Sequence, residues 1–235
     1  IELVANRTAT GRLSPARIAS FLNRPANKRL DRTAEKRGRK TADRSPDKTM
    51  GNLKDLLSDD SAWPLVREWI DAASNQVEVL QASDPSRSQA LEETQVTTRS
   101  PMGAVVYETG GLLIDGGWLR ILGSGHPRLP RTLPGWNKGR TWTEGEPAPP
   151  ILIVADDVIG GSFAINGGGL NGPMGHVHYF APDRLVWEPL EFGYSEFLQW
   201  VLVGKIDEYY EAWRWPGWRA EVSELPGDKA FSIYP

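Results

Sequence analysis

The sequence predicts an α+β protein in which an antiparallel sheet of about five to six strands is flanked by N-terminal and C-terminal helices. Helical patterns come first, short apolar runs bounded by Gly, Asn or Asp follow, and helical patterns return at the end. This order is typical of α+β folds rather than of alternating βαβ units. The apolar runs also lie close together in the chain, which favours an antiparallel meander.

Charge divides the 235-residue chain into two parts. Residues 1–49 carry thirteen Lys and Arg against five Asp and Glu, a net charge of +8, and their only aromatic residue is Phe21. Such a segment cannot offset the entropy lost on folding, so we expect 1–49 to be a disordered basic tail. Because the chain begins with Ile1 and Met50 directly precedes the first well-patterned segment, upstream translation is the expected origin of this tail. Residues 50–235 are then a single domain.

The composition of residues 50–235 excludes several kinds of site. This part has fourteen basic and twenty-five acidic residues, a net charge of −11, and contains all ten tryptophans. The absence of cysteine excludes disulfides, thiolate zinc sites and cysteine nucleophiles. No apolar run approaches the roughly 20 residues that span a bilayer, and the N-terminal residues lack the apolar stretch expected of a secretory signal. We therefore expect a cytoplasmic protein without a membrane partner.

Three short helices are expected before the first strand. Ser61 is placed to cap a helix that has Pro64 in its first turn. Asp84-Pro85 and Ser100-Pro101 begin the second and third helical segments, and Gly110-Gly111 is expected to end the third. The first strand would then begin near residue 112.

The expected strands are short apolar runs separated by turn residues. They cover residues 112–115, 118–122, 151–155, 162–166, 176–181 and 185–187. Gly116-Gly117 has the composition of a tight hairpin. Residues 123–150 are dense in Gly and Pro and predict a long surface loop, a kind of segment that is usually functional or poorly ordered.

Two helices are expected after the sheet. Ser195 is placed to cap a helix that Gly204 closes, and Asp207 starts a second helix that extends through Trp213. Most of the tryptophans are expected in the core, where large aromatic rings stabilise a domain that has no disulfides. These are the residues at positions 63, 69, 118, 187, 200, 213, 215 and 218.

Short motifs across the domain carry a resemblance to a known family. They are WPLV at 63–66, TTRSP at 97–101, GWLR at 117–120, GSGHP at 123–127, ADD at 155–157, FAP at 180–182, GYSEFL at 193–198 and RWPGW at 214–218. With these motifs the region from Leu53 to the C-terminus resembles a bacterial family known as domain of unknown function 2625. More distantly, residues 155–198 resemble the SUKH superfamily. That resemblance implies a SUKH-like α+β fold and a role shared by many members, which are immunity proteins that bind and neutralise secreted toxins.

The long loop holds the candidate partner-binding residues. Arg128, Arg131, Trp136 and Trp142 are interleaved there with further basic residues, and Trp and Arg are enriched at binding hot spots. These side chains are expected either to form a contact surface for a protein or an anionic ligand, or to fold back onto the domain.

Two histidines carry the alternative, enzymatic hypothesis. His176 and His178 are two apart on an expected strand, so their side chains face the same side. With Asp156 or Asp157 they would make a metal site for hydrolysis, although a catalytic metal generally needs three protein ligands. Consecutive carboxylates at a strand end diverge, and the simpler interpretation is a turn in which aspartate accepts backbone N–H bonds.

Two further motifs are explained more simply by structure. Residues 167–172 satisfy G-x-G-x-x-G, but Pro173 and a strand follow where a phosphate site requires a helix. Ser124 lies beside Gly123 and Gly125 without the G-x-S-x-G context of a nucleophile. We expect a connection between strands in the first case and no hydrolase in the second.

The sequence as a whole favours a non-catalytic protein-interaction module over a metal-assisted hydrolase. We expect no cofactor, and no nucleic-acid binding by residues 50–235. The acidic domain suits a basic protein partner, such as a basic toxin, because opposite electrostatic fields speed encounter.

Overall fold

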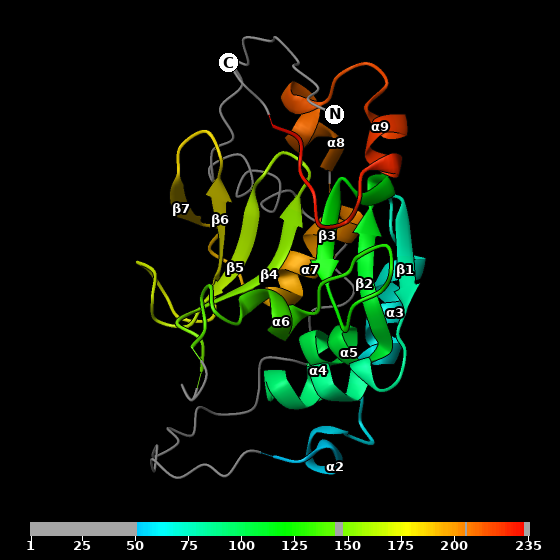
Figure 1. Ribbon diagram of the computed structural model, residues 1–235, viewed down its shortest axis with the longest axis vertical. Coiled ribbons are helices and arrows are strands. Elements are labelled where there is room, and N and C mark those ends of the chain that lie inside the picture. The colour runs from blue at the N-terminus through cyan, green and yellow to red at the C-terminus, as the bar shows by residue number, and fades with distance from the viewer. Residues whose placement is uncertain (1–50, 144–147, 205, 233–235) are drawn as a thin grey trace, which may run out of the picture.

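The computed structural model describes residues 51–143, 148–204 and 206–232, in which helices pack around one antiparallel sheet (Figure 1). Seven strands pair in their order along the chain. This arrangement confirms the α+β class and the meander, with slightly more strands than predicted. The tail expected at 1–49 and Met50 lie outside the described residues.

The strands are β1 (Val77–Gln81), β2 (Thr109–Ile114), β3 (Leu119–Leu122), β4 (Ile151–Asp157), β5 (Ser162–Asn166), β6 (Val177–Ala181) and β7 (Val186–Pro189). The strand β1 corrects the expectation that the first strand begins near residue 112. It lies at an edge of the sheet, and Leu80 is its only buried residue, so the segment lacks the apolar run that indicates a strand.

The helices are α2 (Leu53–Leu56), α3 (Trp63–Asp71), α4 (Ser86–Thr94), α5 (Pro101–Glu108), α6 (Leu133–Asn137), α7 (Tyr194–Val203), α8 (Ile206–Tyr210) and α9 (Trp218–Glu224), with short 3-10 turns η1 (Asp115–Gly117) and η2 (Glu211–Trp213). Ser100 caps α5 as expected, accepting a hydrogen bond from the Gly103 N–H at 3.0 Å. Ser195 was wrongly expected to cap α7, because the cap position is Gly193 and the helix begins one residue before Ser195. Gly110-Gly111 does not end α5 either, since both residues lie inside β2.

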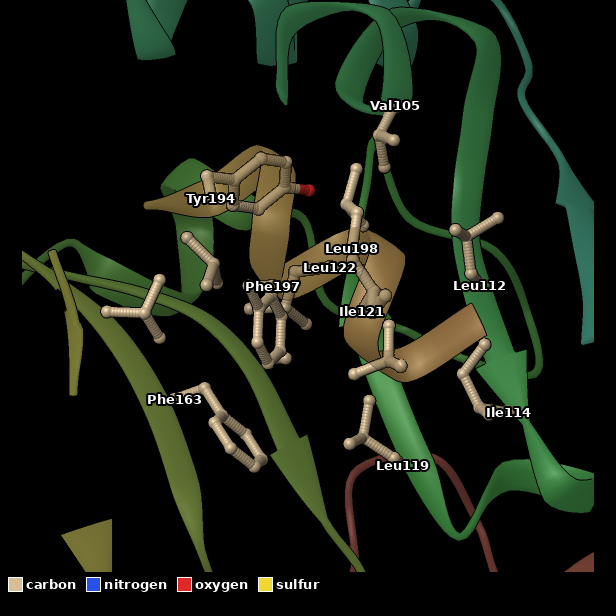
Figure 2. Packing of buried hydrophobic residues seen from close by; sticks show 14 of the residues in the cluster. Val105, Leu112, Ile114, Leu119, Ile121, Leu122, Phe163, Tyr194, Phe197 and Leu198 are labelled. Atoms are coloured by element: carbon tan, nitrogen blue, oxygen red, sulfur yellow. The ribbon is translucent and has the colours of Figure 1, made fainter. Parts of the chain in front are cut away.

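The hydrophobic core lies between one face of the sheet and helix α7 (Figure 2). Phe163 on β5 contacts Phe197 of α7 with ring centroids 5.0 Å apart, and Tyr179 on β6 at 4.7 Å. Trp118, Trp200 and Trp218 are buried, and the other tryptophans expected in the core are partly buried against it. Because side chains alternate along a strand, the neighbours of Phe163 face the opposite side of the sheet.

The segment after β3 departs from the surface loop expected at residues 123–150. Gly123 bridges to Thr132, and the chain then forms α6. Leu129 and Leu133 in this segment are fully buried, so its first half packs on the domain instead of extending into solvent. Residues 144–147 lie outside the described part of the chain.

Candidate functional site

One row of paired residues crosses all seven strands on the face of the sheet opposite α7. From β1 to β7 it runs through Glu78, Leu113, Arg120, Asp156, Ser162, Phe180 and Trp187. Directly paired residues of antiparallel strands project from the same face, so each side chain adjoins the next. Charged groups therefore gather over β1 to β4, whereas Phe180 and Trp187 pack together over β6 and β7 with ring centroids 5.3 Å apart.

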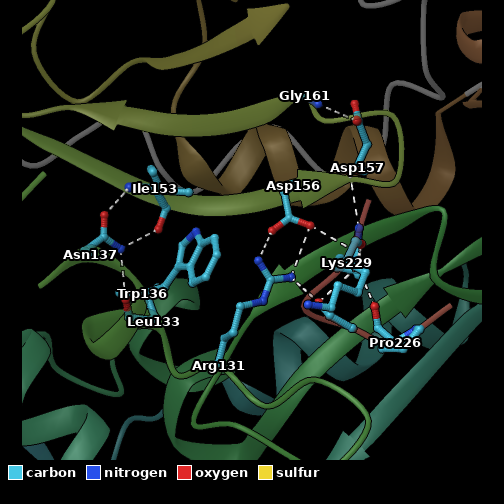
Figure 3. Close-up of polar contacts among 12 residues, drawn as sticks. Arg131, Leu133, Trp136, Asn137, Ile153, Asp156, Asp157, Gly161, Pro226 and Lys229 are labelled. Atoms are coloured by element: carbon cyan, nitrogen blue, oxygen red, sulfur yellow. Dashed lines mark hydrogen bonds and ion pairs between the residues drawn. The ribbon is translucent and has the colours of Figure 1, made fainter. Parts of the chain in front are cut away.

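A buried group of three charges occupies the middle of this row (Figure 3). The Asp156 carboxylate pairs with Arg120 of β3, whose Nε lies 3.0 Å from Oδ1, and with Arg131 of the segment after β3. The three side chains are between 4% and 11% exposed. Burial lowers the pKa of Arg120 below its ordinary value, and the Asp156 charge opposes that shift. Two guanidinium groups thus share one carboxylate away from water.

The same two arginines hold the C-terminal segment against the sheet. Arg120 Nη1 donates hydrogen bonds to the carbonyl oxygens of Gly227 at 3.0 Å and Lys229 at 2.8 Å. Arg131 Nη2 also donates to the Gly227 carbonyl. Gly227 suits this place because an added Cβ would lie 2.2 Å from the Arg128 carbonyl oxygen. The two arginines therefore join three chain segments that are distant in sequence.

Helix α6 is fixed to β4 through one amide side chain. Asn137 Nδ2 donates to the carbonyl oxygens of Leu133 and Ile153, both at 2.8 Å, and its Oδ1 accepts from the Ile153 N–H at 2.7 Å (Figure 3). Thr132 caps the helix by accepting from the Gly135 N–H at 2.9 Å. Asn137 is fully buried, so α6 has a defined position on the sheet.

This position places Trp136 between two arginines. The guanidinium carbon of Arg131 lies 4.4 Å from the centroid of the Trp136 ring, and that of Arg140 lies 4.0 Å from it. Trp136 is half-buried, Arg131 is buried and Arg140 is exposed. The stack thus leads from the buried ion pair to the surface.

The four partner-binding residues expected from the sequence occupy different environments. Arg131 and Trp136 are in contact, and Arg131 is buried by Asp156. Arg128 is half-exposed and pairs with Glu78 on β1. Trp142 is half-buried in the turn after α6, where its backbone N–H donates to the Asn137 backbone carbonyl at 3.2 Å.

Three residues that organise this face were not expected from the sequence. They are Glu78, Arg120 and Asn137. Arg120 carried a detectable signal, because it is a charged residue inside the apolar run Leu119–Leu122. Glu78 and Asn137 carried none, since their partners are distant in the sequence.

Asp157 projects from the opposite face of β4, so the expected divergence of the two carboxylates is confirmed. Its Oδ1 accepts from the N–H groups of Ile159 and Gly161, as expected for a turn aspartate. Its Oδ2 accepts from the hydroxyls of Tyr179 at 2.8 Å and Tyr210 at 3.0 Å. Burial raises the pKa of Asp157 from 3.8 to about 6, and the hydrogen bonds to the carboxylate oppose that rise.

The histidines and carboxylates of the metal hypothesis do not meet at one point. His178 is buried, with Nε2 lying 2.9 Å from the Asn171 carbonyl oxygen, whereas Asp156 and Asp157 contact arginines and tyrosines. Among residues 51–143, 148–204 and 206–232, no group of three or more His, Asp or Glu side chains is arranged to hold a metal ion.

The serine and glycine motifs have structural explanations. Ser124 is buried and donates to the Thr109 carbonyl at 2.8 Å. The glycines of 167–172 belong to the connection from β5 to β6, where Asn166 Oδ1 accepts from the Gly168 and Leu170 N–H groups. The expected connection between strands is therefore confirmed for residues 167–172, and Ser124 hydrogen-bonds within the fold.

Comparisons with known proteins extend over most of the chain. The model of a family described as protein of unknown function DUF2625 matches residues 53–235. The putative uncharacterized protein YbfG of Escherichia coli K12 is 53% identical over 178 residues, covering 76% of this chain and 81% of that protein. An uncharacterized protein of Haemophilus influenzae is 46% identical over 187 residues, covering 79% of this chain and 82% of that protein. No solved structure matches.

Within the described part of the chain, no helix combines the length and the apolar content that crossing a bilayer requires.

Proposed function

Because this chain belongs to the DUF2625 family, whose description names no activity, we propose from the geometry that it is a non-catalytic module that binds a protein partner. The proposed contact surface, here called the loop face, comprises Arg128, Trp136, Lys138, Arg140 and Trp142. All five side chains are exposed or half-buried, and they lie on the segment that is joined to the sheet by Arg131 and Asn137.

The observation that carries the proposal is the placement of Trp136 between Arg131 and Arg140. Trp and Arg are the residue types that contribute most at protein interfaces. Here the ring is held by a buried ion pair on one side, and α6 is joined to β4 by two hydrogen bonds between Asn137 and Ile153. A surface that is ordered before binding loses less conformational entropy when a partner arrives. This rigidity supports recognition by the loop face.

Three of the polar groups in the enzymatic alternative are engaged by the fold. Asp156, Asp157 and His178 each contact groups of the domain itself. In the proposed function these side chains stabilise the domain.

The charge distribution favours a basic partner. Three cations of the segment are balanced within the domain, because Arg128 pairs with Glu78, Arg131 with Asp156, and Lys138 Nζ lies 3.2 Å from Glu93. Residues 50–235 retain their excess of acidic residues. A basic protein would therefore be attracted to the domain as a whole and would contact the loop face at close range. A secreted toxin that this chain neutralises is the partner we propose, in line with the resemblance to SUKH immunity proteins.

The test measures partner binding with surface variants of the full chain. A protein captured from cells would be purified and titrated against wild type, Arg140→Ala, Trp142→Ala and a control, Arg67→Ala, whose side chain is exposed on α3. We expect Arg140→Ala, which removes one side of the Trp136 stack, and Trp142→Ala each to weaken binding by about tenfold or more, as hot-spot residues do. The control should bind like the wild type.

Added salt provides a second readout. Association with a basic partner should slow as ionic strength rises, because screening removes the long-range attraction. Equal affinity of the wild type and both loop-face variants would exclude the loop face as the contact surface. Association that is insensitive to salt would exclude the basic partner.

A further inference from the structure

Three arginines lie together over β1 to β4. Arg120 belongs to the cross-strand row, and the segment after β3 adds Arg128, which pairs with Glu78, and Arg131, which pairs with Asp156. Asp157 and Asp228 add further negative charge near Arg120. The three guanidinium groups are therefore surrounded by carboxylates, in a domain whose net charge is strongly negative.

A cavity of about 280 Å³ lies next to these groups. It is bounded by the η1 turn, by β3, by the segment that contains Pro127 and Pro130, and by the end of α9 with the residues that follow it. Its volume is close to the lower end of the range of roughly 300–1,000 Å³ that small-molecule sites occupy. The cavity is therefore large enough for a small organic molecule.

The accessible walls of the cavity are polar and apolar in similar parts. The apolar part comes from Pro127, Pro130, Leu225 and Pro226, which are exposed or half-buried, and Arg120 and Arg128 also line the cavity. In a ligand site the apolar surface holds the body of the ligand and the polar groups orient it.

The two arginines differ in their freedom to bind a ligand. Arg120 is buried and already donates to the carbonyl oxygens of Gly227 and Lys229, so it contributes mainly its charge. The side chains of Arg128 and Glu78 are 48% and 46% exposed. An ion pair this exposed contributes little to stability, so Arg128 can exchange the Glu78 carboxylate for another one at small cost.

We propose that this cavity binds a small organic carboxylate that has an apolar body. Arg128 holds the carboxylate through a charge-assisted pair of hydrogen bonds, and the apolar body lies against Pro127, Pro130 and Leu225. Glu224 also lines the cavity and is exposed, so its charge opposes binding and limits the affinity. This site shares Arg128 with the loop face, but ligand binding here does not depend on the protein contact proposed above.

The experiment uses 3-phenylpropanoate as the probe and its neutral amide, 3-phenylpropanamide, as the matched control ligand. Binding to the full chain is followed by NMR through the backbone amides of Gly116 and Gly117, which line the cavity. We expect saturable shifts at these amides with the carboxylate, with an affinity in the millimolar range for a ligand of this size. The amide should bind about tenfold more weakly.

Variants of exposed residues assign the effect to Arg128. Arg128→Gln should weaken binding of the carboxylate by about tenfold and leave the amide unchanged. Glu78→Gln frees Arg128, and Glu224→Gln removes an opposing charge, so each should tighten carboxylate binding. Arg67→Gln, which changes an exposed cation of α3 outside the cavity, should have no effect.

Three results would overturn the proposal. They are the absence of shifts at Gly116 and Gly117, equal binding of the carboxylate and the amide, and carboxylate binding that Arg128→Gln does not weaken. Because no protein partner is present in this experiment, its failure would leave the protein contact at the loop face intact.

Discussion

Arg131 and Asp156 form a buried ion pair that joins the segment after β3 to strand β4. Their side chains are 6% and 11% exposed, and Arg120 shares the same carboxylate. Charges removed from water are tolerated when they are paired and hydrogen-bonded, and both arginines meet this condition through Asp156 and the carbonyl oxygens near Gly227. The pair therefore determines where Trp136 and the C-terminal segment lie.

Replacing the shared carboxylate should be far more damaging than replacing an exposed one. Asp156→Asn leaves two buried guanidinium groups without an anionic partner, and we expect a loss of about 3–5 kcal/mol in the free energy of unfolding. Glu78→Gln removes the exposed partner of Arg128 and should cost less than about 1 kcal/mol. Urea denaturation of both variants measures the difference, and similar small losses would show that Asp156 does not stabilise the fold.

Asp157 should make stability depend on pH. Its pKa is raised in the folded state, from 3.8 to about 6, mainly because the carboxylate is buried. A raised pKa means that the folded state binds the proton more tightly than the unfolded state, so stability is greatest at low pH and falls as pH rises through about 4 to 6. The full difference corresponds to roughly 3 kcal/mol.

Asp157→Asn isolates this contribution, because the amide keeps an oxygen that can accept from the Gly161 N–H. The stability of the variant relative to the wild type should therefore rise between about pH 4 and about pH 6, and then stay constant. Urea unfolding across this range gives the comparison. Parallel pH profiles for the two proteins would contradict the raised pKa.

Asn137 should control the rigidity of α6. Asn137→Ala leaves the Ile153 N–H and C=O without their side-chain partners in a buried place, and each unsatisfied group costs about 1–3 kcal/mol. We expect the free energy of unfolding to fall by about 2–4 kcal/mol and hydrogen exchange at the Ile153 amide to become faster. Lys138→Ala, at the adjacent exposed position, is the control and should change neither quantity measurably.

Gly167 should be required for packing and not for binding phosphate. An added Cβ would lie 2.1 Å from the Pro149 carbonyl oxygen, so Gly167→Ala forces the β5–β6 connection away from residues 149–150. We expect the free energy of unfolding to fall by about 1–3 kcal/mol. In Gly51→Ala the added Cβ has only ordinary contacts at 3.5 Å and beyond, so this control should be nearly neutral. Thermal unfolding of both variants measures this difference. Equal midpoint temperatures for Gly167→Ala and Gly51→Ala would contradict the close contact at Gly167.

Local patterns were sufficient to predict much of the fold. Apolar runs with turn residues between them located β2 to β7, and the helical segments around Pro64, Pro101 and Phe197 were also found. Edge strand β1 and helix α9 were missed. Leu80 is the only buried residue of β1, and Trp218 and Val222 are the only buried residues of α9, so neither segment has a strong hydrophobic pattern.

The candidate site was predicted only in part. Composition pointed to the segment that contains Arg128, Arg131, Trp136 and Trp142, but it could not distinguish the buried arginine from the exposed one. That distinction depends on which carboxylate each arginine reaches, and Glu78 and Asp156 lie 50 and 25 residues away in the chain.

The sequence by itself determined the class of fold, the meander of strands, the divergence of Asp156 and Asp157, and the absence of cysteine chemistry. These features follow from the composition, from side-chain alternation along strands and from local turn preferences. Tertiary structure alone decided the cross-strand row, the two hydrogen bonds between Asn137 and Ile153, the cavity beside Arg128 and the burial of Arg131. Each of them requires residues from distant segments to meet, and pairing of that kind leaves no periodic trace in one sequence.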